Sequence, residues 1–310
     1  MSKPSQKFRK LLAGKELLVA PAAYDALSAK IIEQAGFKVM AISGYGVSAA
    51  LLGKPDVGLA TLPEMVGVAH NIAGAVDIPV FSDADTGYGN AINAMRATEE
   101  FIRAGVAGIH LEDQVAPKRC GHVAGKQLIS LEEAVGKYRA VDKVRRELDP
   151  DFVLIARTDA RGALGGGLEE VIRRGRAYVE AGADLIFPDG LTSLEDLERC
   201  LQEIPAPLLY NMTGVSPLLP MSDLSRLGVA IVEIAGGAFV SAARAMWDFM
   251  QGLQNGGTEF LIEFGRGLRD HPIRNFHQFI GFPEIKKYEE MFLPSEEVQR
   301  KYEETIGYQP

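Results

Sequence analysis

The sequence contains very little cysteine, a single tryptophan and no long hydrophobic run. Its two cysteines, Cys120 and Cys200, cannot build the disulfide framework of a small secreted domain. We therefore expect a reducing, cytoplasmic location. No run of about 18 apolar residues exists, so no transmembrane helix is expected. Residues 1–10 carry charge without the apolar stretch of a signal peptide.

Positive charge is scarce relative to negative charge. The 310 residues include 33 Lys and Arg against 41 Asp and Glu, which gives a net charge of −8. Nucleic-acid binding depends on clustered basic side chains, so nucleic acid is not an expected partner, and neither is a membrane. The content of 47% hydrophobic and 24% charged residues is that of a globular protein, and we expect a small-molecule substrate.

Short apolar runs alternate with amphipathic stretches along most of the chain. Predicted strands lie at 17–21, 38–43, 78–82, 107–111, 152–156, 184–187, 207–210 and 229–233. Predicted helices lie at 25–36, 61–74, 91–104, 131–147, 168–181, 194–203, 221–227 and 237–253. Eight strand-then-helix units favour an α/β fold of the (β/α)8 barrel type over residues 1–253, although a doubly wound sheet would also alternate. Residues 254–310 exceed this count and predict a C-terminal helical extension.

Acidic side chains follow two neighbouring predicted strands. Asp83 and Asp85 are two residues apart, so an extended backbone points both to one side, and Glu112 ends the next strand. Active sites of such barrels form at the carboxyl ends of the strands. An Asp-x-Asp-x-Gly sequence is also common in turns. Because carboxylates suit Mg²⁺, we predict a Mg²⁺ site at these three residues, with Mn²⁺ as a substitute.

The loop after Glu112 carries Cys120 between cationic side chains. A thiol in a positive field tends toward the thiolate, and it can then exchange a proton near neutral pH. The alternative is a small buried hydrophobic residue, as most free cysteines are. The Lys-Arg-Cys-Gly-His setting favours the first interpretation.

Two further strand ends have a functional and a structural interpretation. Residues 43–46, Ser-Gly-Tyr-Gly, form either a plain turn or a set of backbone N–H groups that holds a carboxylate. Arg157 either pairs with Asp159 or Asp85, or clamps a substrate carboxylate.

The last three strand ends are also polar. Asp189 either caps the helix that begins near residue 193 or belongs to the site. Asn211 and Thr213 either satisfy backbone groups or donate to a developing oxyanion. Glu233 ends the eighth strand.

Taken together, these segments resemble a known superfamily. The motifs are Ser43-Gly44-Tyr45-Gly46, Asp83-Ala84-Asp85-Thr86-Gly87-Tyr88-Gly89, Glu112-Asp113-Gln114, Lys118-Arg119-Cys120-Gly121-His122 and Ile155-Ala156-Arg157-Thr158-Asp159-Ala160. Over residues 8–250 the chain resembles the isocitrate lyase/phosphoenolpyruvate mutase superfamily. Its Lys-x-Cys-Gly-His segment resembles the C–C bond lyase branch, which includes methylisocitrate lyase, 2,3-dimethylmalate lyase and the petal death protein.

The resemblance implies a fold, a metal and an assembly. It implies a (β/α)8 barrel whose eighth helix is exchanged between the subunits of a homotetramer. It also implies that Asp85 binds Mg²⁺ directly and that Asp83 and Glu112 act mainly through the waters of the ion.

The same resemblance implies roles around the substrate. The substrate-binding residues would be Ser43, Gly44, Tyr45, Asp56, Gly121, His122, Arg157, Asp189, Asn211 and Thr213. The catalytic residues would be Cys120 as acid/base, with Lys118 and His122 beside it, and Tyr45 as a candidate for removing the hydroxyl proton.

The distal part of the substrate site departs from methylisocitrate lyases. Asp189 stands where those enzymes resemble one another in having Glu, Gly214 follows Thr213 where they have another Glu, and residues 233–238 differ from their Tyr-Pro-Leu-Ser segment. We therefore expect a Mg²⁺-dependent lyase that cleaves a 2-hydroxy di- or tricarboxylate of the 2-alkylmalate or 2-methylisocitrate type to an α-keto acid and a carboxylate. Alternatives are oxaloacetate hydrolysis or decarboxylation, a phosphonate-forming mutase, which Cys120 opposes, and a non-catalytic barrel.

Overall fold

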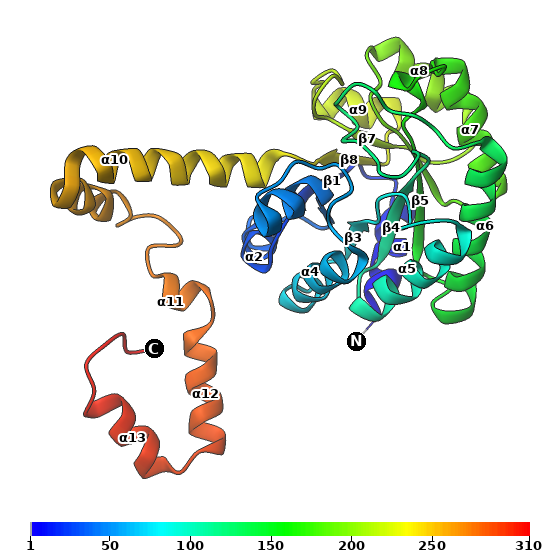
Figure 1. Cartoon of the computed structure of the whole chain (residues 1–310). Coiled ribbons are helices and arrows are strands. Elements are labelled where there is room, and N and C mark those ends of the chain that lie inside the picture. Colours follow the sequence, from blue (N-terminus) through cyan, green and yellow to red (C-terminus); the bar gives the residue numbers. More distant parts are fainter. Residues whose placement is uncertain (1) are drawn as a thin grey trace. The chain divides into compact units, whose positions relative to one another are not determined.

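The computed structural model describes residues 2–310 and contains an eight-stranded parallel barrel (Figure 1). The strands are β1 (Leu18–Ala23), β2 (Met40–Ile42), β3 (Val80–Asp83), β4 (Gly108–Glu112), β5 (Val153–Thr158), β6 (Leu185–Pro188), β7 (Leu209–Asn211) and β8 (Ile231–Ile234). They pair in the order β6-β5-β4-β3-β2-β1-β8-β7, and a parallel bridge between Ile186 and Leu208 joins the two ends. This nearly closed ring confirms the predicted barrel, because a doubly wound sheet would leave two open edges.

Helices alternate with the strands along the chain, and those before α10 surround the barrel (Figure 1). They are α2 (Ala26–Gln34), α4 (Leu62–Ala75), α5 (Ala91–Ala104), α6 (Leu131–Leu148), α7 (Leu168–Glu180), α8 (Leu194–Glu203), α9 (Met221–Leu227) and α10 (Gly237–Gly267). The eight strands and the helices before α10 begin and end within two residues of their predicted bounds. The prediction missed the short α3 (Gly44–Val47), the π-helical turn at Ser48–Leu52 and the 3-10 turn at Ala160–Gly162.

The strands are apolar because helices cover one face and the barrel interior covers the other. Along β5, every residue is buried, including the charged Arg157 near its carboxyl end. Helix ends follow local chemistry: Ser130 Oγ accepts the N–H of Glu133 at 3.1 Å and so caps α6. Gly105 ends α5 with φ at 89°, a left-handed conformation that suits glycine.

A helix that the sequence analysis did not predict, α1 (Pro4–Ala13), packs against the bottom of the barrel interior. Phe8 is fully buried, and its ring stacks on that of Phe81 from β3 with centroids 5.6 Å apart. Arg9 donates to both carboxylate oxygens of Asp184, at 2.7 and 2.9 Å. The strand ends that carry the predicted site lie at the opposite, carboxyl side of the barrel.

Contacts divide the chain into two compact units, one ending at Ala242 and the other beginning at Ala243. Helix α10 runs through this division and through the predicted domain boundary at residues 253–254, so that boundary stays a prediction. Gly257, with φ at 53° and ψ at −131°, interrupts the helical backbone of α10.

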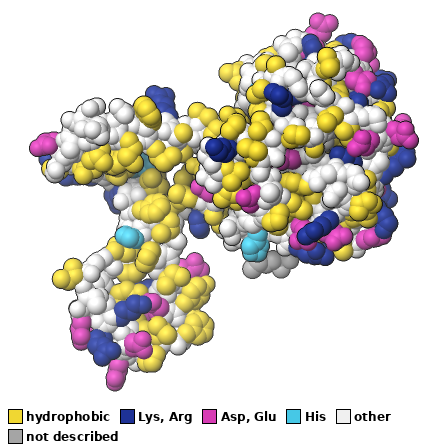
Figure 2. Space-filling view, in the orientation of Figure 1, with side chains coloured by type: hydrophobic (Ala, Val, Ile, Leu, Met, Phe, Trp, Pro, Cys, Tyr) yellow, Lys and Arg dark blue, Asp and Glu magenta, His cyan; other side chains and the backbone are white. Residues whose placement is uncertain are grey.

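The second unit is helical, as predicted for the C-terminal extension. After α10 it contains α11 (Phe276–Phe279), α12 (Phe282–Phe292) and α13 (Ser295–Glu303). Helix α10 has no buried side chain, and hydrophobic side chains gather along it (Figure 2). Trp247, the single tryptophan, is 68% exposed, and Met246 and Met250 beside it are also exposed. Within residues 2–310, no helix is both long enough and apolar enough to cross a membrane.

Candidate active site

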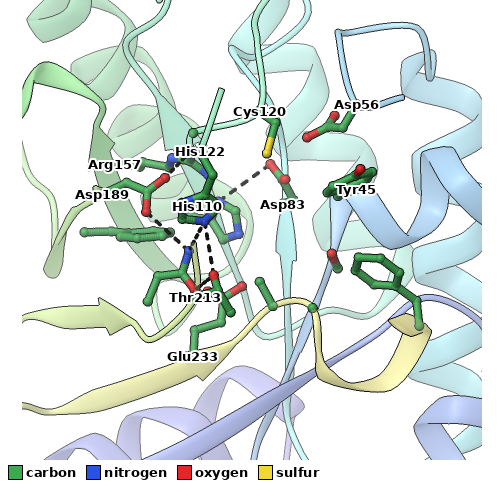
Figure 3. A pocket seen from close by; sticks show the side chains of 18 residues that line it. Tyr45, Asp56, Asp83, His110, Cys120, His122, Arg157, Asp189, Thr213 and Glu233 are labelled. Atoms are coloured by element: carbon green, nitrogen blue, oxygen red, sulfur yellow. Dashed lines mark hydrogen bonds and ion pairs between the residues drawn. The ribbon is translucent and has the colours of Figure 1, made fainter. Parts of the chain in front are cut away.

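A cavity of about 200 Å³ opens at the carboxyl ends of the strands, where the site was predicted (Figure 3). The predicted residues that line it are Ser43, Gly44, Tyr45, Asp56, Asp83, Cys120, Gly121, His122, Arg157, Asp189, Asn211 and Thr213. Asp85, Glu112 and Lys118 are buried beside these residues but do not line the cavity. The structure therefore brings together the residues that the sequence placed on separate strands.

Three acidic side chains at the carboxyl ends of β3 and β4 form an acidic rim: Asp83, Asp85 and Glu112. Asp83 Oδ1 accepts the backbone N–H of Asp85 at 2.9 Å. Asp85 Oδ1 and both carboxylate oxygens of Glu112 are buried without a hydrogen bond among the described residues. Burial raises the pKa of Asp85 to about 6 and the pKa of Glu112 well above its ordinary value.

These oxygens without hydrogen bonds fit a divalent cation, which would add to the positive charge that Lys118 and Arg157 already place near them. Within residues 2–310, no three His, Cys, Asp or Glu side chains converge closely enough to enclose a metal ion by themselves. An ion on this rim would therefore keep several waters, as Mg²⁺ does.

Lys118 ties the loop after β4 to this acidic rim. Its Nζ lies 2.6 Å from Asp56 Oδ1 and 2.9 Å from Asp85 Oδ1, although the second contact lacks the angle of a hydrogen bond. Burial alone would lower the pKa of Lys118, but the surrounding carboxylates, with Asp85 the strongest, raise it well above the ordinary value. The ammonium is therefore charged and cannot serve as a base near neutral pH.

The loop itself is folded down over the cavity. The backbone N–H of Cys120 donates to Asp56 O at 3.1 Å. The side chain of Gln114 forms two hydrogen bonds with the backbone of Arg119: it accepts the N–H at 3.0 Å and donates to the carbonyl oxygen at 2.8 Å. Lys126 Nζ donates to the carbonyl oxygen of Gly121. These contacts describe a closed loop that holds Cys120 at the cavity.

Glycine is required at position 121 for steric reasons. A Cβ there would collide with the carboxylate of Asp189 and the guanidinium of Arg157. The loop can therefore approach the end of β5 closely only without a side chain at this position.

The charge state of Cys120 differs from the sequence-based expectation. Burial raises its pKa above the ordinary value and outweighs the lowering effect of the hydrogen bond from the His122 backbone, and the negative charge of Asp56 adds a smaller rise. The expected tendency toward the thiolate is therefore wrong. The neighbouring Lys118 does not stabilise a thiolate, because its ammonium group forms ion pairs with Asp56 and Asp85. Cys120 is a protonated thiol near neutral pH, which makes it a proton donor.

Arg157 is held by three carboxylates. Its Nη2 donates to Asp189 at 2.6 Å and to Asp159 at 3.0 Å, and its Nε lies 3.3 Å from Glu112 Oε2. Its guanidinium carbon also lies 5.0 Å from the ring centre of Phe187. Within residues 2–310, Nη1 has no hydrogen-bond partner and is left for a ligand.

Asp189 neither caps a helix nor stands as a free anion. Ser193 Oγ caps α8 by accepting the N–H of Asp196 at 3.1 Å. Burial would raise the pKa of Asp189, but the adjacent Arg157 charge outweighs it and leaves the pKa below its ordinary value. Asp189 is therefore an ionised carboxylate whose charge is compensated by Arg157.

A hydrogen-bond network continues from Asp189 to the loop. Asn211 Nδ2 lies 3.2 Å from Asp189 Oδ1 and 3.2 Å from His122 Nε2. Thr213 Oγ1 lies 3.1 Å from the same His122 nitrogen and donates to Asn211 Oδ1 at 2.8 Å. Asn211 and Thr213 thus position His122.

Ser43 caps the one-turn helix α3 (Gly44–Val47), so this segment is helical, and its binding of a carboxylate stays a prediction. Ser43 Oγ accepts the N–H of Gly46 at 3.1 Å, and a Cβ on Gly44 would collide with the Asp83 carboxylate. Tyr45 packs on Phe239 with ring centres 5.2 Å apart and remains partly exposed.

The sequence analysis assigned no role to several residues that line the cavity: His110, Phe187, Glu233, Ala235, Gly236 and Phe239. His110 is buried, and neither ring nitrogen has a hydrogen bond among the described residues, although Nδ1 lies 3.6 Å from Asp83 Oδ1. Burial lowers its pKa to about 4. The available signal was strand alternation, since His110 lies two residues before Glu112 and therefore on the same face of β4.

Comparison with known proteins agrees with this arrangement. The family model for phosphoenolpyruvate phosphomutase matches residues 8–253. The chain is 43% identical to 2,3-dimethylmalate lyase of Eubacterium barkeri, over 91% of this chain and 96% of the relative. It is 37% identical to 2-methylisocitrate lyase of Aeropyrum pernix, over 99% and 95% of the two chains.

Solved structures give the same result. A crystal structure of 2,3-dimethylmalate lyase superposes with a TM-score of 0.88 at 33% identity, covering 99% of this chain and 100% of that one. Oxaloacetate acetylhydrolase in complex with 3,3-difluorooxalacetate superposes with a TM-score of 0.85 at 36% identity, covering 93% and 97%. With its barrel and the Cys120 loop closed over it, the chain belongs to the phosphoenolpyruvate mutase/isocitrate lyase superfamily.

Proposed function

We propose that this carbon–carbon lyase acts on branched 2-hydroxy dicarboxylates of the 2-alkylmalate type and releases an α-keto acid and a carboxylate. The observation that carries the proposal is the position of the Cys120 thiol, which the closed loop holds at the cavity on the side of the acidic rim (Figure 3). Burial raises the pKa of this thiol, which favours its protonated form. The reaction needs a proton donor at that place.

Asp85 would hold Mg²⁺ directly, and Asp83 and Glu112 would act through its waters. In support, Asp85 Oδ1 and both Glu112 carboxylate oxygens are buried without a hydrogen bond among residues 2–310, and Asp83 lines the cavity. The ion would supply a positive charge that stabilises the alkoxide form of the substrate hydroxyl. A structural relative, phosphonopyruvate hydrolase, is described in complex with oxalate and Mg²⁺, at 29% identity and a TM-score of 0.81. Mn²⁺ would serve as a substitute.

The carboxylate next to the reacting hydroxyl would lie against residues 43–45 and Arg157, which line the same cavity. Arg157 contributes its free Nη1, because its other nitrogens are held by Asp159 and Asp189. This preorganised cation orients the substrate without moving during the reaction.

Cleavage then conserves atoms and charge. A base removes the hydroxyl proton, and Tyr45 is the candidate because it lines the cavity. The bond between the hydroxyl-bearing carbon and its neighbour breaks, so that the alkoxide becomes a ketone and the electron pair stays on the neighbouring carbon. Cys120 Sγ donates its proton to that carbanion, which the adjacent carboxylate stabilises. No water, oxidant or reductant is consumed.

The lining of the cavity favours an alkyl group over a third carboxylate. Phe187, Phe239 and Ala235 contribute apolar surface to it. Among the described lining residues, Arg157 is the single permanently charged cation, and it already pairs with Asp159 and Asp189. A third carboxylate would be desolvated without a partner. Branched malates should therefore be cleaved with a higher kcat/KM than 2-methylisocitrate.

A screen with keto-acid detection tests the proposal. Purified protein is incubated with Mg²⁺ and, separately, 2,3-dimethylmalate, 2-methylisocitrate and oxaloacetate, with and without a chelator. We expect chelator-sensitive pyruvate release that is fastest from 2,3-dimethylmalate. A clear preference for 2-methylisocitrate would overturn the alkylmalate specificity and leave the lyase chemistry standing, whereas no turnover of any hydroxy acid would overturn both.

Oxaloacetate hydrolysis is the second candidate, favoured by the similarity to oxaloacetate acetylhydrolase. The two activities give different products. Oxalate and acetate from oxaloacetate would indicate the hydrolase, and pyruvate from a branched malate indicates the lyase.

Helix α10 supports an assembly of several copies. It has no buried side chain and exposes Met246, Trp247, Met250 and Leu253, which a second chain would cover. We propose a homotetramer in which α10 is exchanged between subunits. We also place the protein in the cytoplasm, in keeping with its two free cysteines.

A further inference from the structure

Glu233 is a buried acid at the cavity that the reaction described above does not use. It lies on β8, is 3% exposed and lines the cavity. Its Oε2 is buried and has no hydrogen-bond partner among residues 2–310. It lies beside Thr213, on the side of the cavity away from Cys120 (Figure 3). An unpaired polar atom in this position is costly unless a ligand satisfies it.

The surroundings of Glu233 decide its charge. Asp83 from β3 and Asp189 after β6 face it with negative charge, and Arg157 from β5 faces it with positive charge. His110 from β4 also lines the cavity, but its pKa of about 4 leaves it neutral near pH 7.

The two adjacent strands add no charge. In the sheet, Glu233 pairs with Asn211 of β7 and Ala20 of β1, neither of which titrates. Burial, reinforced by Asp83 and only partly offset by Arg157, raises the pKa of Glu233 to about 8. Near neutral pH its carboxyl is therefore mostly protonated and carries an O–H donor.

We propose that Glu233 is a further substrate-binding residue, whose protonated carboxyl donates a hydrogen bond to a carboxylate oxygen of the bound hydroxy acid. This inference rests on the proposed function for the nature of the ligand. A neutral donor suits the site because the cavity already contains several carboxylates and the substrate brings two more. Ionised Glu233 would both lose its donor and repel the substrate.

The consequence is an affinity that depends on pH. With a pKa of about 8, the protonated fraction of Glu233 falls from about nine tenths at pH 7 to about one tenth at pH 9. Because the apparent dissociation constant is divided by the competent fraction, substrate affinity should fall about tenfold over this range.

The test measures binding separately from cleavage. In a Cys120→Ser background, which removes thiol titration, the Kd of 2,3-dimethylmalate is measured by calorimetry with saturating Mg²⁺ at pH 7 and pH 9. We expect the Kd to rise about tenfold with Glu233 present. With Glu233→Gln added, whose amide donates but cannot ionise, the Kd should change less than about twofold between the two pH values. Glu195→Gln, an exposed acid on α8, is the control and should keep the tenfold change.

A third variant, Glu233→Leu, removes the donor and should weaken binding at pH 7 about tenfold, as expected for loss of a hydrogen bond to a charged group. Equal pH dependence with Glu233 and with Glu233→Gln would overturn the inference, whether or not the leucine variant folds. Binding that behaves as expected without pyruvate release by the wild-type protein would overturn the proposed function alone. Failure of the Cys120→Ser protein to bind 2,3-dimethylmalate at pH 7 would overturn both.

Discussion

Asp189 and Glu233 line the same cavity and are both nearly inaccessible, yet they differ in charge. Burial raises the pKa of each, but Asp189 lies 2.6 Å from the guanidinium of Arg157, and its pKa falls below the ordinary value. Glu233 has no such contact. One carboxylate is neutralised by a cation and the other by a proton, so the cavity is less repulsive toward an anion than its acidic residues suggest.

The acidic rim predicts that Mg²⁺ binding and lyase activity depend on Asp85. Asp85→Ala should abolish Mg²⁺ binding and lower kcat/KM by a factor of about 1,000 or more, because it removes the proposed direct ligand. Asp83→Ala should weaken both less, since its contact would run through water. Calorimetric titration with Mg²⁺ checks this, and equal Mg²⁺ affinity of the wild-type and Asp85→Ala proteins would contradict a metal site at this rim.

The same titration has a defined pH dependence. The pKa of Asp85 is raised to about 6 by burial, and only the ionised form attracts a cation. Mg²⁺ affinity should therefore be full above pH 7 and fall as the pH drops through about 6, where the proton competes with the ion.

The state of Cys120 predicts two results. Cys120→Ser should lower kcat by a factor of about 100 to 10,000, because a hydroxyl is a far weaker acid than a thiol. The thiol of the wild-type protein should also react slowly with iodoacetamide at pH 7, because its raised pKa leaves little thiolate. Near wild-type cleavage by Cys120→Ser would show that another group protonates the carbanion.

The sequence predicted which residues lie at the site more reliably than it predicted their protonation states. Motif position was enough to place Asp85, Cys120 and Arg157 at one end of the barrel. The thiolate expectation for Cys120 was wrong because a neighbouring Lys in the sequence does not show which carboxylates will neutralise it. Glu233 was visible as a strand end, but its raised pKa depends on residues from three other parts of the barrel.

Among the secondary-structure elements, the loop over residues 115–126 is the one expected to move. Its closed form rests on polar contacts, such as Cys120 N to Asp56 O, Lys118 to Asp56 and Lys126 to Gly121. Substrate entry requires these to open. Mg²⁺ with pyruvate should stabilise the closed form, so trypsin cleavage within the loop should slow at least about threefold. Cleavage at a site outside the loop serves as the control, and equal rates with and without ligand would argue against a gate.

The regular elements were predictable because their hydrophobic patterns are local. Every barrel strand lies within two residues of its predicted bounds. The missed elements have weaker local signals. Helix α1 carries the basic residues Lys7, Arg9 and Lys10, so its sequence resembles a charged tail until Phe8 is seen packing on Phe81. Helix α3 contains two glycines in four residues, a composition more typical of a turn.

At the scale of the whole molecule, the exposed face of α10 predicts association. Trp247→Asp should convert the proposed tetramer to smaller species, because a charge would be buried at the interface. Light scattering measures the mass, and the fluorescence of Trp247, the single tryptophan, should shift to the red when wild-type protein is diluted. Arg226→Asp, an exposed change on α9, should leave the mass unchanged. A wild-type protein that is monomeric at micromolar concentration would contradict the assembly.

Helix α1 places a constraint on synthesis at the ribosome. It is translated before the barrel strands, and the carboxylate that Arg9 binds belongs to Asp184, 175 residues later in the chain. At roughly 5–20 residues per second, the two are separated by about 10 to 35 seconds of translation. During that time the apolar face around Phe8 has no barrel to enter. The nascent chain therefore exposes a segment that a chaperone could bind, and the bottom of the barrel is completed only after most of the strands have emerged.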